Sequence, residues 1–369
     1  MARLRLVLSV IGLAARNRGL RRVELAFAAF NGAEWGVWVA LLVYAYGHGG
    51  ATGSALIALV QLVPSALLAP ALASLADRRR PGRVLLAGYL AEAAAMAAVA
   101  AAMALSAPAI VVFALAPLVN LAITVPRPAQ AALIPSLVSR PIELSASNVV
   151  SSWMESLSVL VAPAASGLLL GIGGPRLAVA AMAGLALVAA VLVAPLTGPA
   201  PIPPEPGERA GLVADVGDSL RTIGRDPATR LLVILLGAQY VLIGALDLLY
   251  VVLAIDLLHM GGSGAGYLNA AFGAGGLIGG LVTAALVGRR HLAPLLVCGV
   301  VAAGSALAVL GARPTEAAAF LLLAVAGVGR AVFDVGGRTL LQRVARPEML
   351  ARVFGLLESL MNVGLALGS

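Results

Sequence analysis

Several ionisable residues of this sequence lie inside long apolar runs, where charged side chains are uncommon. Glu34 lies eleven residues after Val23 in one run, and Asp247 lies near the middle of a later one. If these runs are helices that cross a bilayer, a rise of about 1.5 Å per residue places Glu34 near mid-membrane. An ionisable group at that depth is costly, so each carboxylate is a candidate for substrate or proton binding. The alternative is a carboxylate that hydrogen-bonds to a neighbouring helix for packing.

The other candidates for substrate or proton coupling lie on the same helical faces as charged neighbours. Asn31 shares a face with Glu34, and Arg330, Asp334 and Arg338 step by four residues along one run. Such spacing allows an intrahelical ion pair that lowers the cost of burial. It also allows a substrate-binding or gating role for Arg330.

Three further charges receive structural explanations from the sequence. Glu155 and Glu358 occupy equivalent mid-run positions and are expected at an interface between two halves, where an interhelical hydrogen bond explains them as well as transport does. Arg127 lies near the end of an apolar run and can snorkel towards the membrane surface. Glu92 has no partner that the sequence identifies, so it is a weaker candidate for a functional role.

Composition requires a bilayer around these elements. The chain has 369 residues, of which 61% are hydrophobic and 11% charged, whereas a soluble chain carries about 25% charged residues. The mean hydropathy is +1.00. A fold in water would leave large apolar patches exposed. The sequence therefore predicts an all-α integral membrane protein.

Apolar runs of about 20 residues, the length that crosses a bilayer, define eleven predicted spans. They cover residues 23–46, 51–76, 84–105, 108–133, 144–170, 175–196, 231–257, 264–287, 292–310, 316–336 and 349–369. The 25 basic residues are all Arg and concentrate in alternate connections, whereas the intervening connections hold only Arg176 and Arg313. The positive-inside rule then predicts a cytoplasmic N-terminus in the cell (cytoplasmic) membrane.

The spans group into two halves. We expect a cytoplasmic N-terminal segment (residues 1–22), a six-helix bundle (23–196), a cytoplasmic linker (197–230) and a C-terminal bundle of five spans (231–369). His48 and His259 are 211 positions apart, as are Arg78 and Arg289, and Arg127 and Arg338. Such matches predict two six-helix pseudo-repeats in the same orientation, with the twelfth span missing and the chain truncated.

The loop after the second span carries a motif. It reads Ala73-Ser-Leu-Ala-Asp77-Arg78-Arg79-Arg80-Pro81-Gly82-Arg83. This stretch resembles the Gly-x-x-x-Asp-Arg-x-Gly-Arg-Arg pattern of the major facilitator superfamily, with matches at Asp77, Arg78, Gly82 and Arg83. The resemblance implies that these residues form a conformational latch, pairing in one state of a transport cycle.

A second motif points to a branch of that superfamily. Arg127-Pro128-Ala129-Gln130, followed by Leu133-Ile134-Pro135 and then Asn148, resembles bacterial efflux proteins that include siderophore and macrolide exporters. The superfamily's first, fourth, seventh and tenth spans line a central cavity. The resemblance thus implies that Glu34 and Asp247 face this cavity from opposite halves.

The sequence offers little for other functions. The apolar runs lack enzyme signatures, the three His are too scattered for a metal site, and a phosphate-binding loop ending in Lys is impossible without Lys. No cofactor is expected. The arginines are distributed between the spans and not on one face of a domain, which argues against binding of nucleic acid. Gly275-x-x-x-Gly279 and Gly276-x-x-x-Gly280 predict close helix packing.

The sequence thus favours a secondary active transporter. We expect a monomer in membrane lipid that exports a small organic molecule in exchange for protons. The alternatives are an importer or facilitator of an unidentified solute, and a non-transporting membrane sensor. Neither the substrate, the direction nor the coupling ion follows from the sequence.

Overall fold

The computed structural model of the chain describes residues 17–138, 141–196, 226–285, 293–312 and 314–344, and, near the C-terminus, 357, 360, 361 and 363–369. In a few stretches, residues 69–78 among them, only the backbone is described. The chain forms two compact units, Met1–Pro203 and Pro204–Ser369, and each is considered by itself below. The border lies within the predicted linker.

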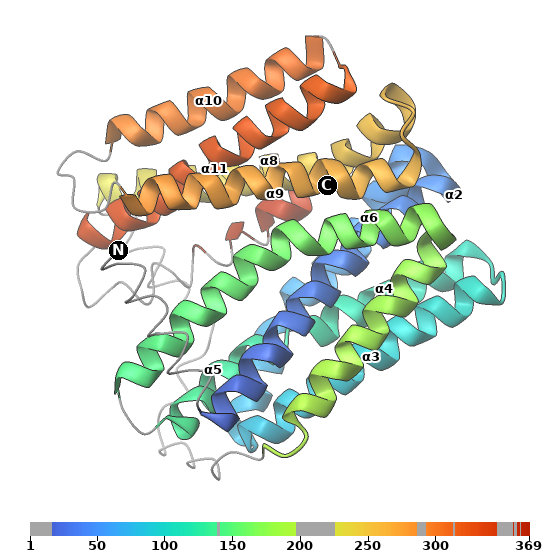
Figure 1. The fold of residues 1–369 in the computed structure, drawn as a ribbon, viewed down its shortest axis with the longest axis vertical. Coiled ribbons are helices and arrows are strands. Elements are labelled where there is room, and N and C mark those ends of the chain that lie inside the picture. The colour runs from blue at the N-terminus through green and yellow to red at the C-terminus, as the bar shows by residue number, and fades with distance from the viewer. Residues whose placement is uncertain are drawn as a thin grey trace. The chain divides into compact units, whose positions relative to one another are not determined.

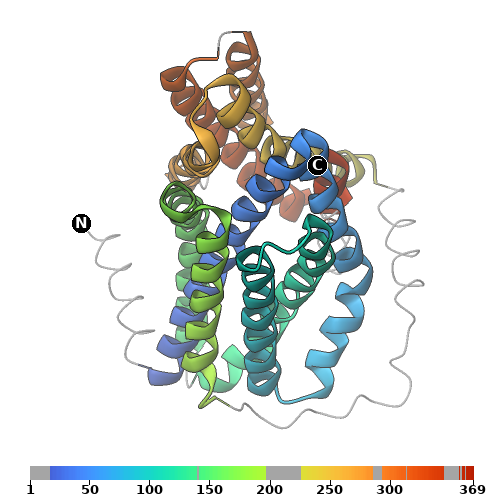
Figure 2. The same ribbon diagram turned by 90° about the vertical axis from the view of Figure 1, so that its right-hand side faces the viewer.

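Unit 1 is a bundle of helices. Its members are α2 (Arg18–Arg78), α3 (Pro81–Ala104), α4 (Ala109–Ile123), α5 (Pro126–Leu137) and α6 (Pro141–Val193). The longest two, α2 and α6, run alongside each other and pack most extensively (Figures 1 and 2). Asn17 caps α2 by accepting the backbone N–H of Gly19 at 3.0 Å, and its amide donates to the Leu137 carbonyl at 2.7 Å.

The helices α2 and α6 each contain a sharp bend at glycine. Gly50 in α2 and Gly174 in α6 have φ angles of +59° and +70°, which only glycine adopts without strain. The two arms of α2 stay close beside this turn, because the Ser54 hydroxyl donates to the Leu42 carbonyl at 2.9 Å. A Cβ on Gly53 would lie 2.5 Å from the Ala45 carbonyl oxygen. Each bend separates two of the spans predicted from the sequence.

Unit 2 is also helical throughout its described part. It contains α8 (Pro227–Val252), a single π-helical turn η1 (Leu253–Leu257), α9 (Gly261–Ala285), α10 (Ala293–Ala312) and α11 (Glu316–Val344). Here α11 packs against α8, α9 and α10, most extensively against α9. Leu236, Leu296, Phe333 and Leu341 meet in its core.

Glycines set the distance between α9 and α11. A Cβ on Gly279 would lie 2.5 Å from the Val328 carbonyl oxygen, and a Cβ on Gly275 would overlap the Ala324 carbonyl. The first predicted small-residue stripe is thereby confirmed as a close helix contact. A Cβ on Gly276 or Gly280 would meet no atom within 4 Å among the described residues, so close packing through the second stripe stays a prediction.

Length and hydropathy make seven of the described helices able to cross a membrane. They are Arg18–Leu68, Pro81–Ala104, Ala109–Leu137, Met154–Val193, Pro227–Leu257, Gly261–Thr283 and Glu316–Leu341, with Leu296–Ala312 as a shorter apolar helix. The first and fourth contain the glycine bends of α2 and α6. Large apolar side chains such as Leu67, Ile172 and Leu281 are more than two-thirds exposed, which suits hydrocarbon and not water. The predicted fold class, an all-α integral membrane protein, is confirmed.

Candidate functional site

A guanidinium joins three helices in unit 1. Arg127 donates from Nη2 to Glu34 Oε2 at 2.7 Å and from Nη1 to Glu155 Oε1 at 3.1 Å. Its Nη2 also reaches Asn31 Oδ1 at 3.2 Å. The side chains of Arg127, Glu34 and Glu155 are 37%, 24% and 48% exposed, so the group is half-buried. We call these four residues, drawn from α2, α5 and α6, the Arg127 cluster.

A break in the helix preceding Arg127 positions its side chain. Helix α4 ends at Ile123, and α5 begins at Pro126, whose missing N–H and fixed φ suit the first position of a helix. Pro126 packs against α3, where a Cβ on Gly88 would lie 3.2 Å from its Cγ. The sequence interpretation of Arg127 as a snorkelling residue is therefore wrong: the side chain turns to carboxylates inside the bundle.

Aromatic rings complete the surroundings of the guanidinium. Arg127 Cζ lies 5.5 Å from the ring centroid of Phe30 and 5.9 Å from that of Phe27. A cation over aromatic faces is stabilised by the ring quadrupoles. Asn31 is held in place as well, because its amide donates to the Phe27 carbonyl at 2.8 Å. The cluster thus has a fixed geometry in which Asn31, singled out from the sequence, is a partner of Arg127.

A second buried carboxylate of α2 escaped the sequence analysis. Glu24 is 3% exposed and accepts hydrogen bonds from two α6 hydroxyls, Ser147, a short contact, and Ser151 at 2.8 Å. Glu24 lies beside Val23 at the start of a predicted span, where a charge is ordinarily expected at the membrane surface. The two serines are four residues apart on one helical face, and this spacing was the signal that could have found the pair.

Unit 2 contains its own charged group around Asp334. Arg338 Nε donates to both Asp334 oxygens, at 3.2 and 3.3 Å, which is the intrahelical ion pair that the spacing allowed. Gln239 of α8 donates to Asp334 Oδ1 at 2.7 Å. Arg338 Nη2 reaches the Tyr240 hydroxyl at 3.3 Å and Met361 Sδ at 3.2 Å. We call these five residues the Asp334 cluster.

The other candidates of unit 2 lie near this cluster or within the same helices. Arg330 Cζ lies 6.0 Å from the Tyr240 ring centroid, and no hydrogen-bond partner of its buried Nε is found among the described residues. Asp247 is 8% exposed in α8. The side chain of Glu358 lies outside the described residues, so its predicted interface role stays a prediction.

Comparison with known proteins decides the family. The sequence model of the Major Facilitator Superfamily matches residues 24–369, nearly the whole chain. The chain belongs to the Major Facilitator Superfamily. No curated protein matches it. The predicted superfamily is thus confirmed, and the chain is a multi-pass membrane transporter of this kind.

Solved structures of transporters share the fold at low sequence identity. A bacterial homolog of the human lysosomal transporter Spinster has 19% identity and a TM-score of 0.73, over 94% of this chain and 80% of that one. The nucleoside transporter NupG has 15% identity and a TM-score of 0.66, over 95% and 89%. A bacterial homologue of the iron transporter ferroportin has 16% identity and a TM-score of 0.69, over 94% and 89%.

The superfamily latch residues are only partly described. The side chains of Asp77 and Arg78 lie outside the described residues. Gly82 is buried and Arg83 exposed in the first turn of α3, which begins at Pro81. Their predicted pairing therefore stays a prediction.

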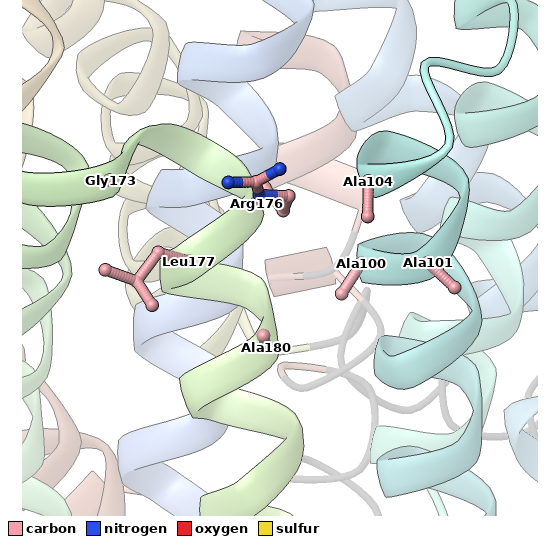
Figure 3. Close-up of a pocket in the computed structure, with 7 residues that line it drawn as sticks. All are labelled: Ala100, Ala101, Ala104, Gly173, Arg176, Leu177 and Ala180. Atoms are coloured by element: carbon pink, nitrogen blue, oxygen red, sulfur yellow. The ribbon is translucent and has the colours of Figure 1, made fainter.

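Unit 1 also has an apolar hollow of about 400 Å³ between α3 and the last part of α6. It is lined by Ala100, Ala101, Ala104, Gly173, Arg176, Leu177 and Ala180 (Figure 3). Arg176 is its one charged lining residue, and none of the predicted coupling residues lines it. None of its lining residues belongs to the Arg127 cluster, so the hollow is a separate feature of unit 1.

Proposed function

We propose that this superfamily member is a secondary active transporter that couples the movement of a small organic molecule to that of protons, with Glu34 and Arg127 as the coupling pair. The observation that carries the proposal is the 2.7 Å contact between Arg127 Nη2 and Glu34 Oε2 inside a membrane span. Glu34 can carry either a negative charge or a proton, whereas Arg127 stays charged. Proton binding to Glu34 therefore weakens this contact and leaves Arg127 held by Glu155 and Asn31.

This change in pairing supplies a mechanism for coupling. With Glu34 ionised, Arg127 ties α2 to α5 and α6. With Glu34 protonated, the ion pair between α2 and α5 is lost and only the Asn31 contact joins Arg127 to α2, so the guanidinium can bind an anionic or polar group of a substrate. The ionised Glu34 and the substrate group then compete for one guanidinium, so the protonation of Glu34 and substrate binding are thermodynamically coupled.

We further propose export from the cytoplasm as the direction, on the resemblance of the Arg127–Gln130 motif to siderophore and macrolide exporters. Asp247, Arg330 and Asp334 of unit 2 are proposed to contribute to substrate or proton binding. Asp77, Arg78, Gly82 and Arg83 are proposed to act as the latch. Each of these roles rests on sequence and family resemblance.

Transport in proteoliposomes tests the coupling pair. A screen by thermal shift first identifies a solute that stabilises the purified protein, and its uptake is then driven by a pH gradient. We expect Glu34→Gln to abolish pH-driven accumulation but to retain counterflow, the exchange of solute for solute that needs no net proton movement. Glu316→Gln, which removes an exposed carboxylate at the start of α11, is the matched control and should retain both.

The outcomes separate the alternatives. Full pH-driven accumulation by Glu34→Gln would make this carboxylate structural. Saturable flux without any dependence on the pH gradient would make the protein a facilitator. Absence of flux for every stabilising solute would favour a sensor.

Orientation is tested with cysteine labelling. Cys298 is the single cysteine, so its replacement by Ser gives a background for single introduced cysteines. We propose that the N-terminus and the linker (residues 197–230) lie in the cytoplasm of the cell. Labelling of a linker cysteine by an impermeant reagent outside intact cells would contradict this orientation.

A further inference from the structure

Glu92 is a fully buried carboxyl group that the proposed coupling mechanism does not use. It lies in the middle of α3 and is 0% exposed. Among the described residues, neither of its carboxyl oxygens has a hydrogen-bond partner. An ionised carboxylate in such surroundings is strongly disfavoured unless a cation or hydrogen-bond donors compensate it. A protonated carboxyl group avoids most of this cost.

The charges around Glu92 do not compensate it. The charges that act on Glu92 include that of Glu34, which disfavours its ionised form, and that of Arg127, which favours it. Arg127 is already bonded to two carboxylates, Glu34 and Glu155, so these two negative charges exceed its one positive charge. An ionised Glu92 would add a third negative charge to the same group. The neighbouring charges therefore favour the neutral form in addition to desolvation.

Among the described residues, no cation from the helices packed against α3 is hydrogen-bonded to Glu92. These helices are α2, α4, α5 and α6. Besides Arg127 on α5, the ionisable residues near this group are Glu24 and Glu34 on α2 and Glu155 on α6, and α4 carries none. On α3 itself, Tyr89 is 0% exposed, and its hydroxyl has no partner among the described residues.

Tyr89 connects the two sites physically. Its ring centroid lies 5.6 Å from that of Phe30, and the Phe30 ring is one of the two beneath Arg127. Glu92 thus lies on a helix that packs directly against the aromatic floor of the Arg127 cluster. A shift of Arg127 changes the field at Glu92 without a direct bond between them.

We propose that Glu92 is a second proton-binding site of unit 1, protonated while Arg127 is paired with Glu34 and Glu155. When Glu34 takes up a proton, one negative charge is removed and Arg127 gains freedom to stabilise an ionised Glu92. The Glu92 O–H bond then breaks, its electron pair stays on the carboxylate, and the proton forms a new O–H bond on water, because Glu34 already holds its own proton. The role in transport rests on the proposed coupling function, but the protonation of Glu92 does not.

Infrared spectroscopy of the purified protein in a detergent without ester groups tests the protonation directly, because the ester carbonyls of phospholipids absorb in the same range as protonated carboxyl groups. A protonated carboxylic acid has a carbonyl stretch that is separated from those of carboxylates and amides and shifts when the acid proton is exchanged for deuterium. We expect this band in the unmodified protein at neutral pH, its loss in Glu92→Gln, and its retention in Glu316→Gln. Glu92→Asp, which retains the acid, should show a shifted band and provides the test if Glu92→Gln does not fold.

Two results would overturn the proposal. One is the absence of the band in the unmodified protein, which would show that Glu92 is ionised. The other is an unchanged band in both Glu92→Gln and Glu92→Asp, which would assign the proton to a different carboxyl group. If the band is lost in Glu92→Gln but solute flux does not depend on the pH gradient, Glu92 is protonated as proposed and the proposed coupling function is wrong.

Discussion

The two units place an arginine at equivalent positions of the sequence repeat and give it different partners. Arg127 and Arg338 are 211 positions apart. Among the described residues, Arg127 binds carboxylates from two other helices, α2 and α6, whereas Arg338 binds the carboxylate of Asp334 on its own helix and also reaches Tyr240 on α8 and Met361. An arginine paired across helices holds these helices together, but an arginine paired within a helix compensates a charge locally. On these described contacts, we expect the stability of unit 1 to depend on its arginine more than that of unit 2 does.

The residue preceding each arginine accounts for part of this difference. Pro126 begins a new helix after a break, while Gly337 occupies the corresponding position within the continuous helix α11. In an unbroken helix, a carboxylate four residues earlier lies beneath the guanidinium. Unit 1 has Ile123 at the position that corresponds to Asp334, so Arg127 has no such partner on its own helix.

The largest expected effect is the difference between Arg127→Ala and Arg338→Ala. Removing one partner of a buried pair costs about 3–5 kcal/mol, and the exposure of Arg127 reduces this figure to about 1–3 kcal/mol. We expect less for Arg338→Ala, about 1 kcal/mol, because Asp334 keeps the hydrogen bond from Gln239. Thermal unfolding in one detergent measures both variants. Equal losses would remove the distinction between the units.

A double-mutant cycle sharpens the comparison within unit 1. Glu34→Gln and Arg127→Gln should couple by about 1–2 kcal/mol, since the two side chains are in direct contact. The double variant should therefore lose less unfolding free energy than the sum of the losses measured for Arg127→Gln and Glu34→Gln alone. Purely additive losses in the unfolding free energy would show that the 2.7 Å contact contributes nothing to stability.

Unit 2 has one interhelical contact to Asp334 that can be removed. Gln239→Ala deletes the donor from α8 and should cost about 1 kcal/mol, the usual net contribution of a hydrogen bond. It should also increase the loss caused by Arg338→Ala, because Asp334 would then have neither partner. If the Gln239 and Arg338 effects do not depend on each other, the Asp334 cluster does not act as a unit.

The smallest effect is expected from Tyr240→Phe. It removes a hydroxyl 3.3 Å from Arg338 Nη2 and leaves the ring near Arg330, so the expected loss is about 0.5 kcal/mol. A further Arg330→Ala change in this background tests the ring contact. If Tyr240→Phe lowered the unfolding free energy more than Arg338→Ala does, the Tyr240 hydroxyl, and not the ion pair, would be the main source of stability in the Asp334 cluster.

The sequence predicted the fold better than the site, and particular residues show why. Apolar runs identified the helices because hydropathy is a property of each run alone. The Gly275–Gly279 contact followed from spacing for the same reason. The pairing of Arg127 with Glu34 and Glu155 depends instead on residues 93 and 28 positions away and on the break before Pro126. Predicting such contacts requires knowledge of which helices lie next to each other in the fold.

At the glycine turn in α2, the two arms of the helix lie in contact with no intervening loop. Gly49 and Gly50 are the non-helical residues there, the Ser54 hydroxyl joins the arms, and Gly53 touches the opposite backbone. Chain tips are usually where proteins accept inserted tags and where related chains vary in length. At this tip an insertion must separate two backbones that are in contact. Epitopes and fluorescent fusions therefore belong elsewhere in the chain, and natural variation here should take the form of substitutions at unchanged length.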